Sequence, residues 1–403
     1  MTEPLKRIFM VAGEHSGDLL GGKLLEALHV RHGRPFALAG VGGEHMAAQG
    51  LESLFPISDV AVMGPAAILA RLPKLVRRVY QTVDAAIAFQ PDLVVIIDSP
   101  EFTHPIAKRI RKRMPGVPII DYVSPSVWAW RPGRAAKMRP YVDHLLALLP
   151  FEPEAHIRLG GPPCTYVGHP LIEKLDWADA LDANELRTRL DLTPGLPVLV
   201  VLPGSRPTEV RRLMQPFGEA IRELRATHGP LEVILPAVAS VRPLIEEGLL
   251  SWPQQPYLVE GDDNKWKAFK LADAALAASG TVTLELGLAG TPMVVAYRVD
   301  AIAARLRFML KVPSVVLANL VLGENAFPEL LQEECTPDKL SAALLPLLTP
   351  TPERRAQLAA LTDLRAKMLS DGEAPSDRAA AIVMRTLRPG QRRRKRQAWR
   401  KAS

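Results

Sequence analysis

Cysteines and long apolar runs are scarce in this sequence. Only two of its 403 residues are cysteines, Cys164 and Cys335, and they lie far apart. Their separation matches no metal-binding pattern and indicates a reducing compartment. The apolar runs at 93–97 and 144–150 are much shorter than the roughly 18 residues that would indicate a membrane-spanning helix. The apolar stretch after Arg7 is also too short for a signal peptide, so we expect a cytoplasmic protein.

Charge is distributed unevenly along the chain. Residues 388–403 contain eight of the 50 Lys and Arg residues and no acidic residue. The other 387 residues carry 42 basic and 43 acidic side chains, so the net charge of +7 comes from this tail. Residues 1–150 carry 18 basic and 13 acidic side chains, whereas residues 151–387 carry 24 and 30. The opposite signs suggest different partners for the two halves.

Short apolar segments alternate with helical patterns, which is typical of parallel sheets with crossover helices. Because the apolar runs are continuous, each sheet should be covered on both faces. We predict two doubly wound α/β domains that face a cleft, with a boundary near 170–180, and candidate ligand sites beyond the carboxyl ends of the strands. The expected strands lie at 7–12, 36–41, 93–98, 118–123 and 144–149 in the first half, and at 197–205, 231–237, 256–261, 274–278 and 293–298 in the second.

The stretch GEHSGD (13–18) follows the first expected strand. Gly17 in this stretch, with Gly22 and Lys23 beyond it, nearly matches a G-x-x-x-x-G-K-[S/T] phosphate loop, but Leu24 stands where Ser or Thr is needed. Glu14 and Asp18 are acidic, which disfavours a triphosphate ligand. A structural alternative is that Ser16 or Asp18 caps the following helix.

Asp98 ends the apolar run at 93–97 and therefore lies at the edge of the sheet where ligands bind. A partly desolvated carboxylate suits a general base, because burial raises its proton affinity toward neutral pH. The alternative interpretation, a cap for the next helix, is equally compatible with the sequence.

Two strand ends in the second half carry residues suited to a diphosphate. Gly204 permits a close backbone approach, Ser205 can donate a hydrogen bond, and the Arg206 guanidinium suits phosphate. Small residues at Gly280 and Thr281 begin a helix, and Glu285 one turn later could bind a ribose diol; helix caps without a ligand are the alternative. A third polar loop, Asp262-Asp263-Asn264, superficially resembles a metal motif, but we expect no metal and no cofactor.

Basic and aromatic residues cluster between residues 64 and 139, which hold 13 Lys and Arg residues against five acids. The stretch at 124–139 adds two tryptophans to four cations. These runs are either solvated helix faces or a surface that contacts an anionic membrane or stacks on sugar rings. The candidate membrane surface mixes apolar and basic residues, namely Met63, Ile68, Leu69, Arg71, Leu72, Lys74, Arg77 and Arg78.

Seven motifs occur in order and together resemble bacterial lipid-A-disaccharide synthase, a GT-B glycosyltransferase, over about residues 7–335. They are GEHSGD (13–18), IIDSPEF (96–102), SPSVWAWRPGR (124–134), VGHPL (167–171), LPGSR (202–206), ASGTVTLE (278–285) and LANL…PELLQ (317–332). The resemblance implies transfer from UDP-2,3-diacylglucosamine to 2,3-diacylglucosamine 1-phosphate (lipid X). The product would be the β-1,6 disaccharide 1-phosphate with UDP, formed by inversion at the anomeric carbon.

The resemblance also implies a role for each site residue. Asp98 would be the base, and Glu14, Ser16, Asp18, Glu329 and Gln332 would line the acceptor side or lie close behind it. The UDP contacts would be Ser205, Arg206, Gly280, Thr281, Glu285 and Asn319. The departures from the family pattern are Ala318 in place of a proline and the stretch PAAILARL, which lacks an acidic residue.

The implied organisation is an acceptor and membrane-facing domain at 1–175 and a UDP-sugar domain at 176–349. Helices at 350–387 would return to the first domain, and the basic tail at 388–403 should have no fixed structure. The protein would be peripheral on the inner face of the cytoplasmic membrane, and a homodimer through the C-terminal helices remains open. A UDP-sugar epimerase is the main alternative, and a nucleic-acid-binding protein that uses the tail is a weaker one.

Overall fold

The structure is a computed structural model that describes residues 5–61, 65–299, 312–369 and 372–387, with only the backbone of 65–70. The chain divides into two compact units. The first unit comprises residues 1–172 and 371–403, and the second comprises 173–370. Each unit is described by itself below.

The first unit contains a parallel sheet of six strands in the order β2-β1-β3-β4-β5-β6. All five residues of β3 are buried, as expected for a central strand that is covered on both faces. The strands are β1 (Arg7–Ala12), β2 (Ala37–Val41), β3 (Leu93–Ile97), β4 (Ile119–Tyr122), β5 (His144–Ala147) and β6 (Cys164–Tyr166).

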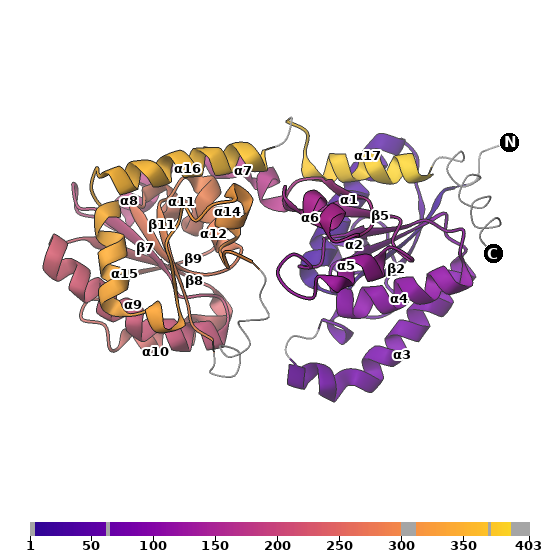
Figure 1. The fold of residues 1–403 in the computed structure, drawn as a ribbon, viewed down its shortest axis with the longest axis horizontal. Coiled ribbons are helices and arrows are strands. Elements are labelled where there is room, and N and C mark those ends of the chain that lie inside the picture. The colour runs from indigo at the N-terminus through magenta and orange to yellow at the C-terminus, as the bar shows by residue number, and fades with distance from the viewer. Residues whose placement is uncertain (1–4, 62–64, 300–311, 370–371, 388–403) are drawn as a thin grey trace. The chain divides into compact units, whose positions relative to one another are not determined.

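Helices cover both faces of this sheet. Helices α1 (His15–His32) and α17 (Pro375–Leu387) pack together on one face, whereas α3 (Pro65–Phe89) and α4 (Pro100–Arg113) pack together on the other (Figure 1). The shorter helices of this unit are α2 (Glu44–Ala47), η1 (Ile57–Asp59), α5 (Gly133–Met138) and α6 (Glu152–Arg158), and η2 (Pro170–Lys174) spans the boundary.

The second unit contains another parallel sheet of six strands, in the order β12-β11-β10-β7-β8-β9. Its central strands are again continuous apolar runs, and every residue of β7 and β10 is buried. The strands are β7 (Val198–Leu202), β8 (Glu232–Ala237), β9 (Tyr257–Glu260), β10 (Ala274–Ala278), β11 (Met293–Tyr297) and β12 (Glu329–Leu331).

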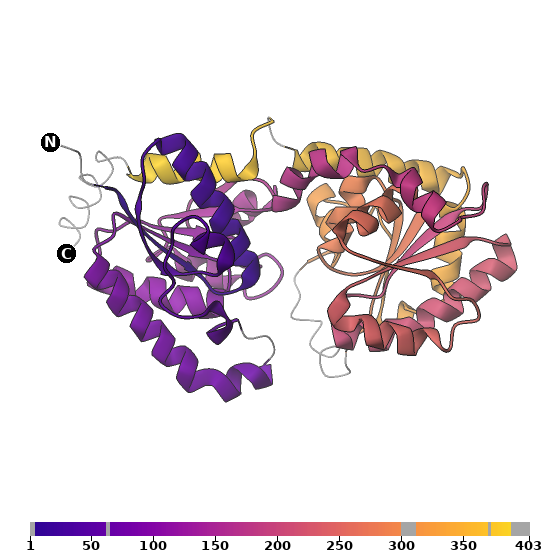
Figure 2. The ribbon, with the colours of Figure 1, turned by 180° about the vertical axis from the view of Figure 1, so that it is seen from behind.

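The helices of the second unit also form two layers (Figure 2). One layer contains α9 (Pro207–His228), α10 (Arg242–Leu249) and α15 (Pro337–Leu344), and the other contains α11 (Asp262–Leu271), α12 (Val282–Ala289), α14 (Leu317–Leu322) and α16 (Pro352–Met368). The remaining helices are α7 (Leu175–Ala180), α8 (Ala183–Arg189), η3 (Ala239–Val241), η5 (Gln332–Glu334) and η6 (Leu345–Leu347).

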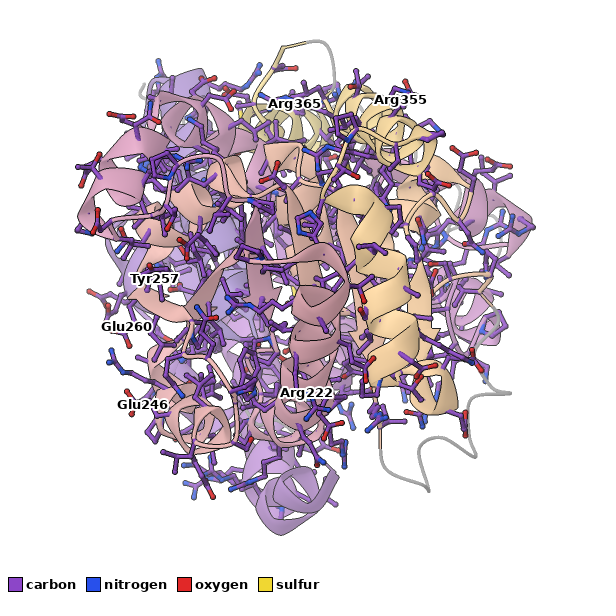
Figure 3. All side chains as sticks on the ribbon, turned by 90° about the vertical axis from the view of Figure 1, so that its left-hand side faces the viewer. Arg222, Glu246, Tyr257, Glu260, Arg355 and Arg365 are labelled. Carbon is purple, nitrogen blue, oxygen red and sulfur yellow. The ribbon has the colours of Figure 1, made fainter. Side chains whose placement is uncertain are left out.

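Surface ion pairs connect some of these elements. On the face shown in Figure 3, the carboxylates of Glu246 in α10 and Glu260 in β9 both accept from the guanidinium of Arg242, at 2.8 and 2.9 Å. These side chains are largely exposed, so the pairs contribute little to stability.

Helix α16 corrects the expected organisation of the C-terminal helices. The expectation was that all helices after residue 350 return to the first domain, but α16 belongs to the second unit. Its Gln357 side chain bonds both backbone groups of Met293 in β11, at 2.8 and 3.2 Å. Leu364 packs so closely on Gly287 of α12 that an added Cβ would lie 2.2 Å from it. Helix α17 packs on α1 in the first unit, and the tail at 388–403 lies outside the described residues.

Candidate active site

Most of the predicted site residues follow two neighbouring strands in each sheet, β1 and β3 in the first unit and β7 and β10 in the second. In the first unit the strand order reverses between the neighbours β1 and β3, and in the second unit it reverses between the neighbours β7 and β10. Such a topological switch point is where open α/β sheets bind ligands, because the loops after the two strands diverge there. Each unit therefore has one candidate site, at the carboxyl ends of the two strands on either side of its switch point.

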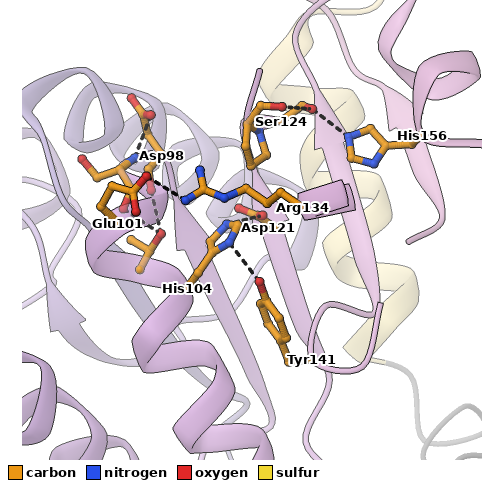
Figure 4. A network of polar contacts seen from close by, with 11 residues as sticks. Asp98, Glu101, His104, Asp121, Ser124, Arg134, Tyr141 and His156 are labelled. Atoms are coloured by element: carbon orange, nitrogen blue, oxygen red, sulfur yellow. Dashed lines mark hydrogen bonds and ion pairs between the residues drawn. The ribbon is translucent and has the colours of Figure 1, made fainter. Parts of the chain in front are cut away.

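Four polar side chains meet at the switch point of the first unit. Ser16 Oγ donates to Asp98 Oδ2 at 3.1 Å, and Ser99 Oγ donates to Glu14 Oε1 at 2.8 Å. Asp98 and Glu14 are half-buried, and Ser16 is exposed. The structure thus brings together three predicted residues and adds Ser99, and it leaves the Asp98 carboxylate at the edge of the sheet (Figure 4).

The backbone at Asp98 adopts an uncommon conformation. Asp98 and Ser99 have φ angles of 55° and 43°, in the left-handed region that non-glycine residues rarely occupy. The Ser99 amide donates to Asp98 Oδ1 at 2.7 Å, and Thr103 Oγ1 in α4 donates to the Asp98 carbonyl at 2.8 Å. Strain of this kind is concentrated at functional sites, where the surrounding structure fixes a side chain in position.

Asp18, which we predicted on the acceptor side, has a buried side chain that bonds backbone amides. Its side chain is 2% exposed and accepts hydrogen bonds from three backbone amides. These come from Gly43, His45 and Met46, at 2.7, 3.0 and 3.1 Å. The carboxylate therefore satisfies the free N–H groups at the start of α2 and does not face a ligand.

The loop after β7 presents Ser205 and Arg206 at the surface. Glu209 lies beneath them, 5% exposed, and accepts from both of their backbone amides, at 3.1 and 3.2 Å. Its other oxygen accepts from the Arg206 guanidinium at 2.9 Å and from the Tyr297 hydroxyl at 3.2 Å. A side chain at Gly204, where φ is 112°, would come within 2.5 Å of the Glu209 carboxylate.

Glu209 and Tyr297 belong to this site but were not predicted from the sequence. Glu209 follows Arg206 by three residues at the start of α9, and that spacing is the sequence signal of a capping box. Tyr297 ends β11, and its sequence context has no comparable signal. Burial and the Glu209 carboxylate raise the pKa of Tyr297, so the hydroxyl stays protonated and donates.

The loop after β10 forms the other half of the second site. Gly280 has a φ of 151°, and the exposed Thr281 stands immediately before α12. Glu285 is half-buried and accepts from Lys265 Nζ at 3.0 Å. Lys265 also pairs with Asp262 at 3.2 Å. The stretch Asp262-Asp263-Asn264, expected in a loop, forms the first turn of α11. Among the described residues, no group of three or more His, Cys, Asp or Glu side chains is placed to bind a metal ion.

Asn319, which we predicted as a UDP contact, has a buried side chain that bonds neighbouring segments of the second unit. Its side chain is 1% exposed and bonds both backbone groups of Phe327, at 2.9 and 3.0 Å. Its amide also donates to Glu329 at 2.9 Å, and Glu329 accepts from Ser314 Oγ and from the Val315 amide. These residues lie in the second unit and tie the loop before α14 to β12.

Gln332 has a similar structural contact. Its side-chain oxygen accepts from the Val299 amide at 2.7 Å, just after β11. Gln332 itself has a φ of 53°. Like Glu329, it lies in the second unit with the predicted UDP residues, so neither residue shares a unit with Asp98.

Helix α3 contains most of the candidate membrane surface. Arg71, Leu72 and Arg77 are exposed, whereas Lys74 and Arg78 both pair with Asp59, at 2.6 and 3.0 Å. Met63 and the side chains of Ile68 and Leu69 lie outside what the structure describes. No helix in the described part of the chain is both long and apolar enough to cross a membrane.

Comparison with known proteins decides the family. A family model described as lipid-A-disaccharide synthetase matches residues 8–382. The chain belongs to this family. The lipid-A-disaccharide synthase of Nitrobacter hamburgensis is 52% identical, covering 95% of this chain and 96% of its own length. That of Nitrobacter winogradskyi is also 52% identical, covering 97% and 98%.

Solved structures with similar folds are more distant in sequence. The UDP-GlcNAc 2-epimerase of Neisseria meningitidis bound to UDP-GlcNAc has a TM-score of 0.58 at 13% identity, over 94% of this chain and 99% of that one. The glycotransferase of kitacinnamycin has a TM-score of 0.60 at 18% identity, over 96% and 100%. These likenesses show the fold alone, and that fold is GT-B. With the family, they identify a glycosyltransferase of lipid A biosynthesis.

Proposed function

We propose that the enzyme transfers 2,3-diacylglucosamine from its UDP donor to the 6-hydroxyl of lipid X. The products are the β-1,6 disaccharide 1-phosphate and UDP. The observation that carries this proposal is the pair of switch-point sites, because one offers a carboxylate and the other offers an exposed guanidinium beside small residues. The family relationship supports the lipid A disaccharide as the product.

In this proposal Asp98 is the general base. It accepts the proton of the acceptor 6-hydroxyl while that oxygen attacks the anomeric carbon of the donor. The bond from this carbon to the UDP oxygen breaks on the opposite face, so the configuration is inverted. The contacts of Ser16 and Ser99 with Asp98, and the left-handed backbone there, support a side chain fixed in one orientation.

The departing diphosphate would bind the second unit. Arg206 and Ser205 are exposed there, and the free N–H groups at the start of α12 follow Gly280 and Thr281. Glu209 fixes the Arg206 guanidinium, so little ordering is needed when the leaving group develops its charge. Glu285 would accept from the ribose hydroxyls. These groups neutralise the leaving group, and the proposal therefore includes no metal or cofactor.

We also propose a peripheral position on the inner face of the cytoplasmic membrane. Both substrates carry acyl chains, and α3 exposes Arg71, Leu72 and Arg77. Basic residues of this kind contribute about 1 kcal/mol each beside an anionic surface. A homodimer through the C-terminal helices remains compatible with the proposal, which involves no nucleic acid.

The test is an assay of purified full-length protein with UDP-2,3-diacylglucosamine and lipid X in mixed micelles. We expect UDP and the disaccharide 1-phosphate to appear in equal amounts. Asp98→Asn should form both products about 10²–10⁴-fold more slowly, whereas Asp84→Asn, which removes an exposed carboxylate on α3, should match the wild type. Conversion of UDP-GlcNAc alone, with no transfer to lipid X, would identify an epimerase instead.

A further inference from the structure

A basic groove in the first unit begins one helical turn beyond Asp98. It has a volume of about 420 Å³ and lies between α4 and the segment that contains α5. Its polar lining comprises Glu101, His104 and Lys108 from α4, Arg134 and Lys137 from α5, and Arg131 and Tyr141 on either side of α5. The α4 residues recur at three and four positions, so they share one face of that helix.

Most of the positive charge in this groove has no carboxylate partner. Glu101 is the only acidic residue in its lining, and it already pairs with Arg134 at 2.7 Å (Figure 4). Arg131 lies over the ring of Trp130 at 4.1 Å, and Lys108 lies over the ring of Tyr141 at 5.1 Å. Among the described residues, no acidic side chain pairs with either of them or with Lys137.

The floor of the groove is polar but already bonded. His104 is 4% exposed and bonds Asp121 through Nε2 at 3.1 Å and the Tyr141 hydroxyl through Nδ1 at 3.0 Å. Burial raises the pKa of Tyr141 to about 12, so this hydroxyl is a donor at neutral pH. Asp121 is 1% exposed and lies behind His104. The Asp121 carboxylate is therefore shielded by His104, and the side chains at the entrance of the groove are mainly cationic.

We infer that this groove binds a phosphomonoester, and that in catalysis it binds the 1-phosphate of lipid X. This second clause rests on the proposed function. Guanidinium and ammonium groups are the side chains that bind phosphate most strongly, through charge-assisted hydrogen bonds. The groove follows α4 from Glu101 to Lys108, a rise of roughly 10 Å at 1.5 Å per residue, which is comparable to a sugar phosphate. A phosphate bound there places the rest of the sugar toward Asp98.

The test compares two acceptors in the double variant Lys108→Gln/Lys137→Gln. One acceptor is lipid X, and the other is 2,3-diacylglucosamine without the phosphate. We expect the KM for lipid X to rise about tenfold or more, since a charge-assisted hydrogen bond is worth more than a factor of ten. The kcat, the KM for the UDP donor and the KM for the unphosphorylated acceptor should stay unchanged, because the contact is equal in the ground and transition states.

Two matched variants accompany the test. Lys112→Gln removes an exposed cation of the same helix outside the groove and should behave as the wild type. Lys137→Arg keeps the charge and should retain the affinity for lipid X. An equal rise in KM for both acceptors in the double variant would overturn the inference. So would a loss of binding to phosphatidylglycerol vesicles without a change in lipid X affinity, because the groove would then bind a membrane surface.

Direct binding separates this inference from the proposed function. With saturating UDP on the second unit, equilibrium dialysis of the wild type against labelled inorganic phosphate and glucosamine 1-phosphate should show one saturable site that the double variant lacks. If the wild type binds phosphate in this way but transfers no sugar, the assignment of the groove as a phosphate site stands and the proposed function is wrong. If transfer occurs but the wild type shows no saturable phosphate site and the double variant keeps its preference for lipid X, the groove assignment is wrong.

Discussion

The switch points of the two units present opposite chemistry on similar sheets. In the first unit Asp98 and Glu14 stand at the strand ends and bond hydroxyl groups. In the second unit the buried Glu209 carboxylate lies under the loop after β7 and binds backbone amides, and the Glu285 carboxylate is paired with Lys265. The surface of the loop after β7 therefore carries exposed hydrogen-bond donors such as Arg206. One unit thus offers a base for a hydroxyl group, and the other offers a cradle for an anion.

Burial separates the polar residues near these sites into two groups. Asp18 and Asn319 are almost fully buried, and their bonds to backbone groups shape the loops. Asp98, Ser205 and Arg206 are partly or fully exposed and remain able to contact a ligand. Substitutions in the first group should affect stability, and substitutions in the second should affect binding or turnover. The predictions below test that division.

Loss of the carboxylate at Asp98 should have the largest effect. Asp98→Asn should lower kcat by about 10²–10⁴-fold, the usual contribution of a general base. Its affinity for UDP should be unchanged, because that ligand is assigned to the other unit. Steady-state kinetics and UDP titration calorimetry measure the two quantities. Near-normal turnover would remove Asp98 as the base.

Loss of the guanidinium at Arg206 should have the next largest effect. Arg206→Gln should weaken UDP binding by about 10–100-fold, the value of one or two charge-assisted hydrogen bonds. Arg211→Gln, an exposed arginine on the same helix, is the matched control. An unchanged affinity for UDP in Arg206→Gln would place the diphosphate elsewhere.

Asp18→Ala should destabilise the protein without altering substrate affinity. Three backbone amides at the start of α2 lose their acceptor, so the free energy of unfolding should fall by about 3 kcal/mol. Glu26→Ala, an exposed acid on the same helix, should change it by less than about 0.5 kcal/mol. Urea denaturation gives both values. A raised KM for the acceptor at full stability would return Asp18 to the binding site.

The smallest expected effect concerns the pH dependence of stability in the first unit. Burial lowers the pKa of His156 and of His169 to about 4, and the Leu171 amide donates to His169 Nδ1 at 3.2 Å. Between pH 4 and 6.5 the unfolded chain binds these protons and the folded chain does not, so both histidines make stability fall as the pH is lowered. Burial raises the pKa of Glu152 to about 7, which acts in the opposite direction between pH 4.5 and 7.

The variant His169→Gln isolates one of these contributions. It should reduce the slope of unfolding free energy against pH by up to about 1.4 kcal/mol per pH unit between 4.5 and 6.5. Urea denaturation across that range measures the slope. A slope equal to that of the wild type would mean that His169 is protonated alike in the folded and unfolded states.

The sequence was sufficient to locate the four strands on either side of the two switch points, and the strand ends where we propose the site. Continuous apolar runs predicted β1, β3, β7 and β10, and the residue after such a run is at the ligand edge by topology alone. The edge strands β6 and β12 were missed because each is three residues long and half-buried, so neither shows an apolar run.

The roles of Asp18 and Asn319 could not be predicted in the same way. A polar residue beside a strand end has the same sequence signal whether it faces a ligand or a loop amide. The difference depends on how distant segments pack, such as α2 against α1 or the loop at Phe327 against α14. In the second site, by contrast, Glu209 bonds Arg206 through a capping box at the start of α9. The spacing of three residues between them is a local signal that can be seen in the sequence.

The assignment of UDP to the second unit is the central claim, and hydrogen exchange of the full chain with and without UDP tests it most directly. We predict that saturating UDP slows exchange in the segments 203–209 and 279–285, while the segments 13–18 and 98–103 exchange as in the free protein. Protection of 13–18 and 98–103, with no change at 203–209 and 279–285, would contradict the account and place the nucleotide on the first unit.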